Sequence, residues 1–331
     1  MRILLTGGAG FIGSACLVAL LKRGDDVAVV DAFEDTLYDR HIKEANLRWA
    51  RQHGRFDFHE VDLRNREAMT AVLRRAQPEL VLHLGDVAGV RASIAKATYY
   101  LAVNVTGTAQ LFELSRAVGV KNYVLASSSS VYGGNTKAPF AEGDPVAHPI
   151  SPYAASKRAM ELMAHADQRI HGGHVTLLRL FTVYGPRQRP EMAFHKFMRL
   201  IHSGEAVPMF GDGSTGRDYT FIDDAVAGIL AAAQHPDGYR IYNIGGDRVV
   251  RLNEAITAIG AVVGRTPQIA SRPQQPGDVA LTWADLTRAR AELGYNPTTA
   301  LHTGLTAMWR WYSTQTVSAA PSSIDPRGGV Q

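Results

Sequence analysis

The stretch Thr6-Gly7-Gly8-Ala9-Gly10-Phe11-Ile12-Gly13 decides the fold, because it joins a short apolar run at 3–6 to a helical pattern at 12–23. Glycines at this spacing let the backbone turn tightly and approach a pyrophosphate, whose charge is attracted by the free N–H groups at the start of a helix. A tight turn without a ligand would contain similar glycines, but the position between strand and helix favours a dinucleotide site. We expect the cofactor to contact Gly7, Gly10, Phe11, Ile12 and Gly13.

A second apolar run, 27–31, ends in Asp31, 18 residues after Gly13. A carboxylate at this position binds a ribose hydroxyl pair and repels a 2′-phosphate, and the Ala32 and Phe33 that follow supply no cation. The sequence therefore favours NAD over NADP. Asp62 and Leu63 are expected to flank the adenine, although an Asp that closes a strand is just as often a turn residue.

Short β-branched runs alternate with helical stretches from Arg2 to about Leu180, which is typical of a parallel sheet covered on both faces. The pattern predicts strands at 3–6, 27–31, 57–60, 80–84, 123–127 and 175–180, and helices near 12–23, 65–76, 98–118 and 152–171. These elements indicate an α/β fold with a doubly wound parallel sheet.

The regular alternation breaks after Tyr184, where prolines and a Gly-Asp-Gly turn separate shorter elements. We expect a dinucleotide-binding domain at 1–180 and a smaller substrate-binding domain at 181–312. The two are interleaved, since apolar segments near 224–250 can rejoin the first domain. The Ser-, Pro- and Gly-rich residues 313–331 predict a disordered tail.

The composition is that of an ordinary globular protein, with 46% apolar residues. The 35 Lys and Arg alternate with 31 acidic residues, so the net charge of +4 does not indicate a nucleic-acid partner. No apolar run approaches the roughly 20 residues of a membrane helix, and no leader pattern precedes the first strand. The single cysteine, Cys16, and the absence of zinc-like Cys/His spacing fit a reducing compartment. We expect a cytoplasmic protein without a metal.

Tyr153 and Lys157 lie near the start of a predicted helix, four residues apart and therefore on one face. Deprotonating a tyrosine of reference pKa about 10 near neutral pH requires roughly 4 kcal/mol, which is about what one positive charge at 4 Å supplies at an effective dielectric of 20. The pair can thus act as an acid/base. An ordinary surface tyrosine and lysine would show the same spacing.

Four serines, 127–130, follow the predicted fifth strand. Open parallel sheets bind ligands at the carboxyl ends of their strands, so a hydroxyl from this run can hold a reacting oxygen of the substrate. Taken alone, the run would be read as a polar turn.

These residues resemble the extended short-chain dehydrogenase/reductases and, within them, the nucleotide-sugar epimerases. The resemblance covers nearly the whole chain and is greatest to the UDP-glucuronate 4-epimerases, through the segments 88–93 (AGVRAS), 148–157 (HPISPYAASK), 181–193 (FTVYGPRQRPEMA), 217–224 (RDYTFIDD) and 275–279 (QPGDV). It implies a Rossmann domain with a small carboxy-terminal domain, NAD as cofactor, a UDP-sugar substrate, and a homodimer formed through the helices near 98–118 and 152–171.

Carried over by position, the resemblance makes Tyr153 the acid/base, Lys157 the cation that favours its phenolate, and Ser128 the hydroxyl that shares the substrate's proton. The substrate-binding residues that it implies are Thr182, Arg189, Ser129 and Ser130 around a hexuronate carboxylate, Arg217 at the diphosphate, Asp278 on the uridine side, and Arg91 within the 88–93 segment.

The implied reaction converts UDP-glucuronate to UDP-galacturonate: Tyr153 takes the proton of the 4-hydroxyl while hydride passes to NAD, and hydride then returns to the opposite face of a 4-keto sugar. A UDP-glucose 4-epimerase and a UDP-glucuronate decarboxylase are alternatives. A 4,6-dehydratase is disfavoured, since Ser129-Ser130 stands where it needs an Asp-Glu pair. A non-catalytic NAD-binding regulator is less favoured, because both Tyr153 and Lys157 are present.

The chain departs from the family at one place beside the expected cofactor channel. The family usually reads Leu-Ala-Ala after the fourth strand, whereas this chain reads Leu84-Gly85-Asp86.

Overall fold

The structure, a computed structural model, describes residues 1–273 and 279–318. Its largest element is a sheet of seven parallel strands in the order β10-β6-β5-β4-β1-β2-β3. The strands are β1 (Arg2–Thr6), β2 (Asp26–Asp31), β3 (Asp57–Glu60), β4 (Leu80–His83), β5 (Asn122–Ser128), β6 (His174–Leu180) and β10 (Tyr239–Ile244). The predicted doubly wound parallel sheet is confirmed, with each of the six expected strands in it.

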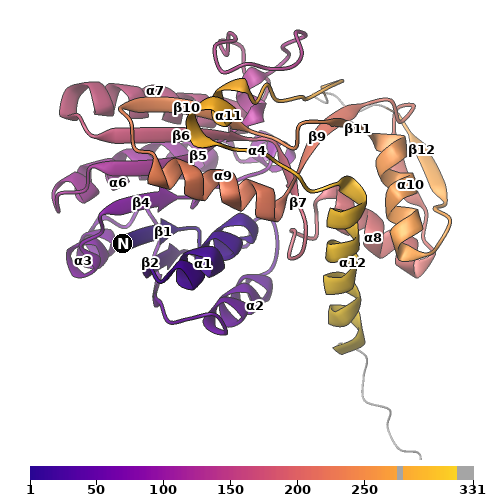
Figure 1. The fold of residues 1–331 in the computed structure, drawn as a ribbon, viewed down its shortest axis with the longest axis horizontal. Coiled ribbons are helices and arrows are strands. Elements are labelled where there is room, and N and C mark those ends of the chain that lie inside the picture. Colours follow the sequence, from indigo (N-terminus) through magenta and orange to yellow (C-terminus); the bar gives the residue numbers. More distant parts are fainter. Residues whose placement is uncertain (274–278, 319–331) are drawn as a thin grey trace, which may run out of the picture.

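The central strands of the sheet are buried on both faces because their apolar side chains alternate between two cores. Ile3 and Leu5 of β1 pack into one core, which also contains residues of α1 (Phe11–Arg23), α2 (Arg40–Arg51) and α9 (Ile222–Gln234). Leu4 packs into the other core, with residues of α3 (Arg66–Ala76), α6 (Thr108–Arg116) and α7 (Pro152–His171). Figure 1 shows the sheet between these two sets of helices.

The helix expected near 98–118 is interrupted. The chain forms α4 (Val90–Ala95), α5 (Ala97–Leu101), a π-helical turn (Ala102–Gly107) and then α6. Asn104 in the π turn accepts a hydrogen bond from the Val87 N–H at 2.8 Å and donates to the Val87 carbonyl at 3.0 Å. The π turn, a feature that often occurs at functional sites, thus fixes the loop after β4.

The helix expected near 152–171 is confirmed as α7, which spans Pro152–His171. Ser151 caps its start by accepting a hydrogen bond from the Ala154 N–H at 3.1 Å, and Pro152 occupies the first turn, where its missing N–H is not needed. Gly172, with φ of 73°, ends the helix. This cap fixes the position of the turn that carries Tyr153 and Lys157.

A smaller part of the molecule lies at the opposite end of the large sheet from the N-terminus (Figure 1). It contains a three-stranded sheet, a two-stranded sheet and three helices. These are β7 (Thr182–Tyr184), β9 (Gly216–Phe221) and β11 (Val249–Arg251); β8 (Val207–Phe210) and β12 (Ile269–Arg272); and α8 (Ala193–Ser203), α10 (Leu252–Val263) and α12 (Leu301–Ser318). The chain returns to the large sheet with α9, β10 and α11 (Thr287–Leu293) between visits to this part.

The carboxyl-terminal helix extends past the predicted end of regular structure. An irregular tail was expected from residue 313, but α12 continues to Ser318, so that expectation is wrong for 313–318. Residues 319–331 lie outside the described residues. Over the described residues, no helix combines the length and the apolar character that crossing a bilayer requires.

Candidate active site

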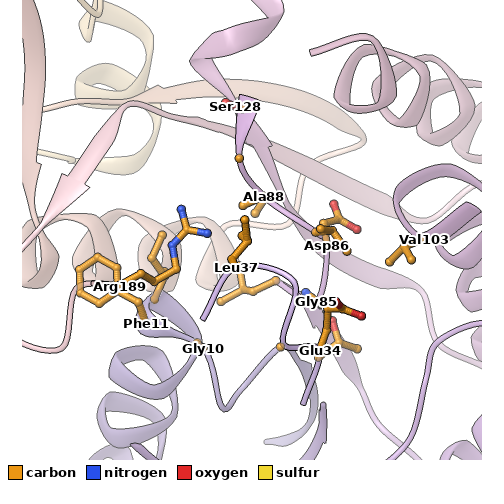
Figure 2. A pocket seen from close by; sticks show the side chains of 18 of the residues that line it. Gly10, Phe11, Glu34, Leu37, Gly85, Asp86, Ala88, Val103, Ser128 and Arg189 are labelled. Carbon is orange, nitrogen blue, oxygen red and sulfur yellow. Dashed lines mark hydrogen bonds between the residues drawn. The ribbon is translucent and has the colours of Figure 1, made fainter. Parts of the chain in front are cut away.

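A cavity of about 410 Å³ opens where β1, β2, β4, β5 and β6 end, which is the place at which open α/β sheets bind ligands. Its walls come from loops that are far apart in the sequence, as Figure 2 shows for Gly10, Glu34, Asp86, Ser128 and Arg189. The fold therefore brings the glycine loop, the serine run and the start of α7 to one cavity.

The glycine loop forms one wall with its backbone. Gly7 has φ of +72°, and a side chain there would collide with the Leu84 carbonyl, while one on Gly13 would collide with the Gly7 carbonyl. The helix that follows begins after Gly10 without a side-chain cap, so its first N–H groups remain available for an anion. All five residues predicted to contact the cofactor here line the cavity: Gly7, Gly10, Phe11, Ile12 and Gly13.

Asp31 lies buried at the end of β2, also in the cavity wall. Its oxygens accept hydrogen bonds from the Ala9 N–H at 3.1 Å and the Phe33 N–H at 2.9 Å. The sequence indicated no cation after Asp31, but Lys43 of α2 reaches it, with Nζ 3.7 Å from Oδ1. Local sequence could not predict this contact between Asp31 and Lys43, since a loop and a helix turn separate the two residues.

Asp62 and Leu63 line the same end of the cavity. Asp62 accepts a hydrogen bond from Arg64 at 2.6 Å, which lowers the pKa of this carboxyl. Leu63 is buried.

Tyr153 and Lys157 line the cavity from the first turns of α7. The Lys157 ammonium lies 5.9 Å from the centre of the Tyr153 ring. It donates a hydrogen bond of 2.7 Å to the Ala126 carbonyl and forms an ion pair with Asp86. The Tyr153 ring packs edge-on against Tyr100, with ring centres 6.2 Å apart. The predicted acid/base pair thus shares one cavity wall.

The serine run closes the next wall. The Ser128 hydroxyl accepts a hydrogen bond from the Ser130 N–H at 3.1 Å, which leaves its own proton available for a bound molecule. Ser129 and Ser130 begin a short 3-10 turn and also line the cavity.

Two more of the residues expected to bind substrate reach the cavity. Thr182 begins β7, and Arg189 follows it in the loop before α8. The Arg189 guanidinium lies 3.3 Å from a Glu191 oxygen. Figure 2 shows Arg189 on the same side as Phe11.

Arg91 and Arg217 are not among the described residues that line this cavity. The Arg91 guanidinium stacks on Phe210, 5.6 Å from the ring centre, and Arg217 on β9 donates to the Gly216 carbonyl at 2.8 Å. Asp278 lies outside the described residues. Over residues 1–273 and 279–318, no group of three or more His, Cys, Asp or Glu side chains could hold a metal ion.

Several residues of the cavity gave no signal in the sequence. The loop after β2 contributes Glu34, Leu37 and Tyr38, and α5 contributes Tyr99. Glu34 accepts a hydrogen bond from the Tyr99 hydroxyl, which ties this loop to α5. No local pattern could link the two residues, because they lie 65 positions apart in the chain.

The chain resembles known proteins along nearly its whole length. Residues 3–245 match the family described as the NAD dependent epimerase/dehydratase family. The UDP-glucuronate 4-epimerase of Thermodesulfobacterium geofontis is 37% identical over 309 residues, which cover 93% of this chain and 95% of that protein.

Solved structures show the same relationship. The crystal structure of UDP-glucuronic acid 4-epimerase from Bacillus cereus, in complex with UDP-glucuronic acid and NAD, superposes with a TM-score of 0.88 and 33% identity, covering 95% of this chain and all 100% of that one. The UDP-glucose 4-epimerase of Thermotoga maritima, with UDP-glucose, gives 0.87 and 32%, covering 96% and 100%. The predicted kinship with nucleotide-sugar epimerases is confirmed, and the chain belongs to the NAD-dependent epimerase/dehydratase family.

Proposed function

We propose that this protein inverts carbon 4 of UDP-glucuronate to give UDP-galacturonate, with NAD as a cofactor that is regenerated in each cycle. The observation that carries this proposal is that Tyr153, Ser128 and Arg189 line one cavity with the glycine loop. An acid/base, a hydroxyl and a cation for a carboxylate then surround the same ligand. The relatives named as UDP-glucuronate 4-epimerases support this choice of substrate.

The residues of the cavity fit a dinucleotide. Gly7 and Gly13 permit a tight turn in which side chains would collide with backbone carbonyls, and the uncapped start of α1 that follows offers N–H donors to a pyrophosphate. Asp31 would accept from ribose hydroxyls, and Asp62 and Leu63 would flank the adenine. When bound, NAD accepts a hydride and returns it.

The residues of α7 and β5 would move the proton. Tyr153 takes the proton of the 4-hydroxyl and gives it back after inversion, as a general base and then a general acid. Lys157 stabilises the phenolate, since its ammonium lies 5.9 Å from the ring centre. Ser128, whose hydroxyl accepts from the Ser130 N–H, has its own proton free to donate to the same sugar oxygen.

Arg189 is the residue that we assign to the substrate carboxylate. A guanidinium offers a planar pair of donors that matches a carboxylate, and Ser129, Ser130 and Thr182 add hydroxyls to the same region. A neutral hydroxymethyl group, as in UDP-glucose, would leave this cation without an anionic partner from the ligand. When this pair of donors binds the carboxylate of a 4-keto intermediate, it keeps the carboxylate out of the geometry that leads to loss of carbon dioxide.

The smaller part of the molecule would hold the UDP group. We propose that residues 181–312, apart from segments near 224–250, form the UDP-sugar-binding domain beside the dinucleotide domain at 1–180. Arg217 lies on β9, next to the strand that begins with Thr182, and would bind the diphosphate together with Arg91. Asp278 is assigned to the uridine on the family resemblance alone.

We also propose a homodimer in the cytoplasm. Large apolar side chains are exposed on the neighbouring helices α4, α5 and α7: Ile94, Leu101, Leu162 and Ile170. A second copy packed on these helices would remove them from water. The single, buried Cys16 suits a reducing compartment.

Separate incubations with UDP-glucuronate and UDP-glucose, with products identified by NMR, test the function. UDP-galacturonate from the first is expected. A UDP-pentose as main product would identify a decarboxylase instead, and conversion of UDP-glucose alone would identify a glucose epimerase. No product from either would favour a non-catalytic NAD-binding protein, for which a Tyr153→Phe variant should behave as the wild type.

A further inference from the structure

We propose that Asp86 is a positioning residue of the active centre: it anchors the Lys157 ammonium and offsets its charge, so that Tyr153 gives up its proton at a higher pH than Lys157 alone would allow. The inference rests on the proposed role of Tyr153 as the acid/base. It explains the acid that the sequence places after β4.

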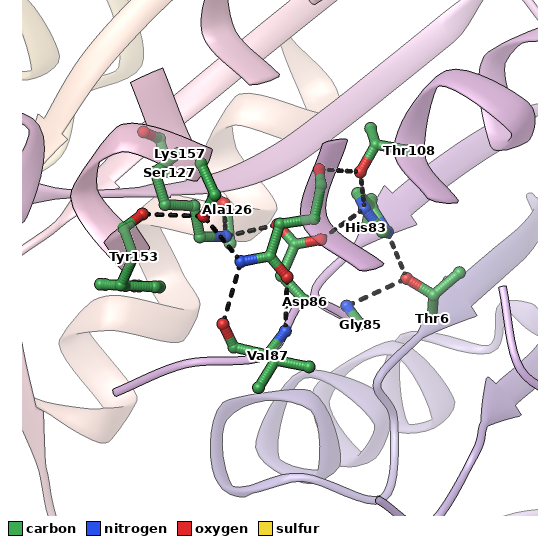
Figure 3. Close-up of polar contacts among 12 residues, drawn as sticks. Thr6, His83, Gly85, Asp86, Val87, Thr108, Ala126, Ser127, Tyr153 and Lys157 are labelled. Carbon is green, nitrogen blue, oxygen red and sulfur yellow. Dashed lines mark hydrogen bonds and ion pairs between the residues drawn. The ribbon is translucent and has the colours of Figure 1, made fainter. Parts of the chain in front are cut away.

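The contact between the two charged groups is direct and buried. The exposed fraction is 4% for the Asp86 side chain and 3% for that of Lys157, so water screens their interaction little. Asp86 Oδ2 and the Ala126 carbonyl take two of the three hydrogen-bond donors of the ammonium. Figure 3 shows this ammonium between Ala126 and Asp86, with Tyr153 one turn away along α7.

The second oxygen of the Asp86 carboxylate lies next to His83. His83 Nε2 lies 3.0 Å from Asp86 Oδ1 and 2.9 Å from Thr108 Oγ1. Because the Thr108 hydroxyl donates its proton to the Asn104 carbonyl at 2.8 Å, it can only accept from His83, so Nε2 carries a hydrogen. That N–H is directed at Thr108, so His83 lies against the Asp86 carboxylate, whose Oδ1 accepts no hydrogen bond from the described residues.

The other nitrogen of His83 is also held. Nδ1 lies 2.7 Å from the Thr6 hydroxyl, whose oxygen in turn accepts from the Gly85 N–H at 3.1 Å. The imidazole is fully buried. The fixed ring confines the carboxylate on one side, and the ion pair with Lys157 and the Ala126 carbonyl hold the ammonium on the other.

Other charged and titratable groups lie around this pair. Those that act on the pair are His83 from β4 and Tyr153 and Glu161 from α7, while Tyr100 of α5 and Arg189 of the loop before α8 lie near Tyr153 or in the cavity wall. Glu161 is matched by its own partners, Arg179 at 2.9 Å and Arg158 at 3.0 Å. Among the described residues, Asp86 is thus the carboxylate that contacts the ammonium.

Neither member of the pair titrates in the working range. Burial favours the neutral acid of Asp86, but Lys157 and His83 outweigh it and hold the pKa of Asp86 at about 2. Burial likewise opposes the charge of Lys157, but Asp86 raises the pKa of Lys157 above its usual value. Between pH 5 and 9 the pair therefore stays ionised and adds no titration step of its own.

Removal of the carboxylate would leave a buried ammonium without a counter-ion, and the phenolate of Tyr153 is the anion placed to supply one. In Asp86→Asn the midpoint of phenolate formation should fall by about one pH unit, from the loss of one negative charge near the phenol. The acid limb of the kcat profile should move the same way.

The direct test is an ultraviolet titration of phenolate in the full chain without cofactor or substrate. The signal of Tyr153 is the difference between each chain and the same chain carrying Tyr153→Phe. Asp86→Asn, or Asp86→Ala if the first variant does not fold, should titrate lower than the wild type, and Asp86→Glu should titrate with it. Asp167→Asn, which breaks an ion pair with Arg116 at another place on α7, is the matched control and should leave the midpoint unchanged.

An unchanged or higher midpoint in the neutral variants would overturn the proposal, as would a glutamate variant that shifts with them. The titration needs no sugar nucleotide. Failure of the wild type to epimerise UDP-glucuronate would contradict the proposed function and leave this result standing, so the two failures are distinguishable.

Discussion

The ammonium of Lys43 lies 3.7 Å from the Asp31 carboxylate at the end of β2, and both side chains are largely buried. The pair balances a charge that would otherwise repel a phosphate. It also places a cation close to the position at which a 2′-phosphate distinguishes NADP from NAD. The Asp31 carboxylate favours the ribose hydroxyls of NAD, whereas the Lys43 ammonium would favour the 2′-phosphate of NADP. The choice of cofactor therefore depends on which of these two groups contacts the ribose.

Asp31→Asn should weaken NAD binding about tenfold, because a charged acceptor of the ribose hydroxyls is lost. The same change should strengthen NADP binding, since Lys43 is left free to attract the phosphate. Calorimetric titration of both nucleotides measures the two effects. In Asp31→Asn/Lys43→Met the gain for NADP should disappear; equal NADP binding by the single and double variants would contradict this role of Lys43.

Tyr153→Phe should lower kcat by at least about a thousandfold, because the step that it serves loses its acid/base. NAD affinity should change by less than about threefold, since the phenyl ring keeps its packing. Tyr100→Phe is the matched control: its hydroxyl donates to the Ala88 carbonyl at 2.6 Å, and its ring packs against Tyr153. That variant should lose about 1 kcal/mol of stability and keep most of its activity; comparable activity in the two variants would remove Tyr153 from the chemistry.

Asp218 on β9 should make the fold less stable as the pH rises. Burial raises the pKa of this carboxyl from 3.8 to about 6, despite hydrogen bonds from the Gly246 and Ala284 N–H groups. The folded state then holds the proton more tightly than the unfolded chain. Stability from this group is complete below pH 3.8 and is lost as the pH rises through 6.

The loss amounts to about 3 kcal/mol at most, for a shift of about two units. Urea unfolding of the wild type at pH 4 and pH 7, beside Asp218→Asn, measures it. In the variant the side chain at position 218 carries no charge at either pH, so its free energy of unfolding should decrease less between pH 4 and pH 7. An equal decrease in both chains would mean that Asp218 does not contribute to the pH dependence.

Local patterns predicted the elements that are built from local signals. Six of the seven strands of the large sheet follow from the alternation of short strand-like runs with helical stretches, and α7 has a Ser-Pro start and a glycine end. Ser128 could be placed at the cavity because carboxyl ends of parallel strands share one edge. The π turn at 102–107 could not, since it leaves the helical pattern of apolar residues nearly unchanged.

The sequence alone could not predict contacts between charged side chains from distant segments. Periodicity tells which face a residue occupies, but not which atom it meets. Asp86 was noticed as an unusual acid, yet its partner Lys157 stands 71 residues away. Lys43 was missed for the same reason, because its partner Asp31 lies on the other side of a loop.

Arg189 should decide between substrates that differ only at carbon 6. Its guanidinium lines the cavity and lies 3.3 Å from Glu191, which orients it without occupying all of its five donors. A substrate carboxylate can take the remaining ones. Arg189→Met should lower kcat/KM for UDP-glucuronate about a hundredfold, the equivalent of roughly 3 kcal/mol for a charge-assisted pair, and leave NAD affinity unchanged.

Arg187 offers a matched control two positions earlier in the same loop, because its guanidinium stacks on Trp49 at 4.3 Å from the ring centre and not in the cavity. Arg187→Met should retain the wild-type preference for the acidic sugar. Steady-state kinetics with UDP-glucuronate and UDP-glucose for both variants gives the comparison. If Arg189→Met lost activity on the two sugars in equal proportion, the arginine would serve the common UDP group or the fold, and recognition of the carboxylate would have to come from Ser129, Ser130 and Thr182.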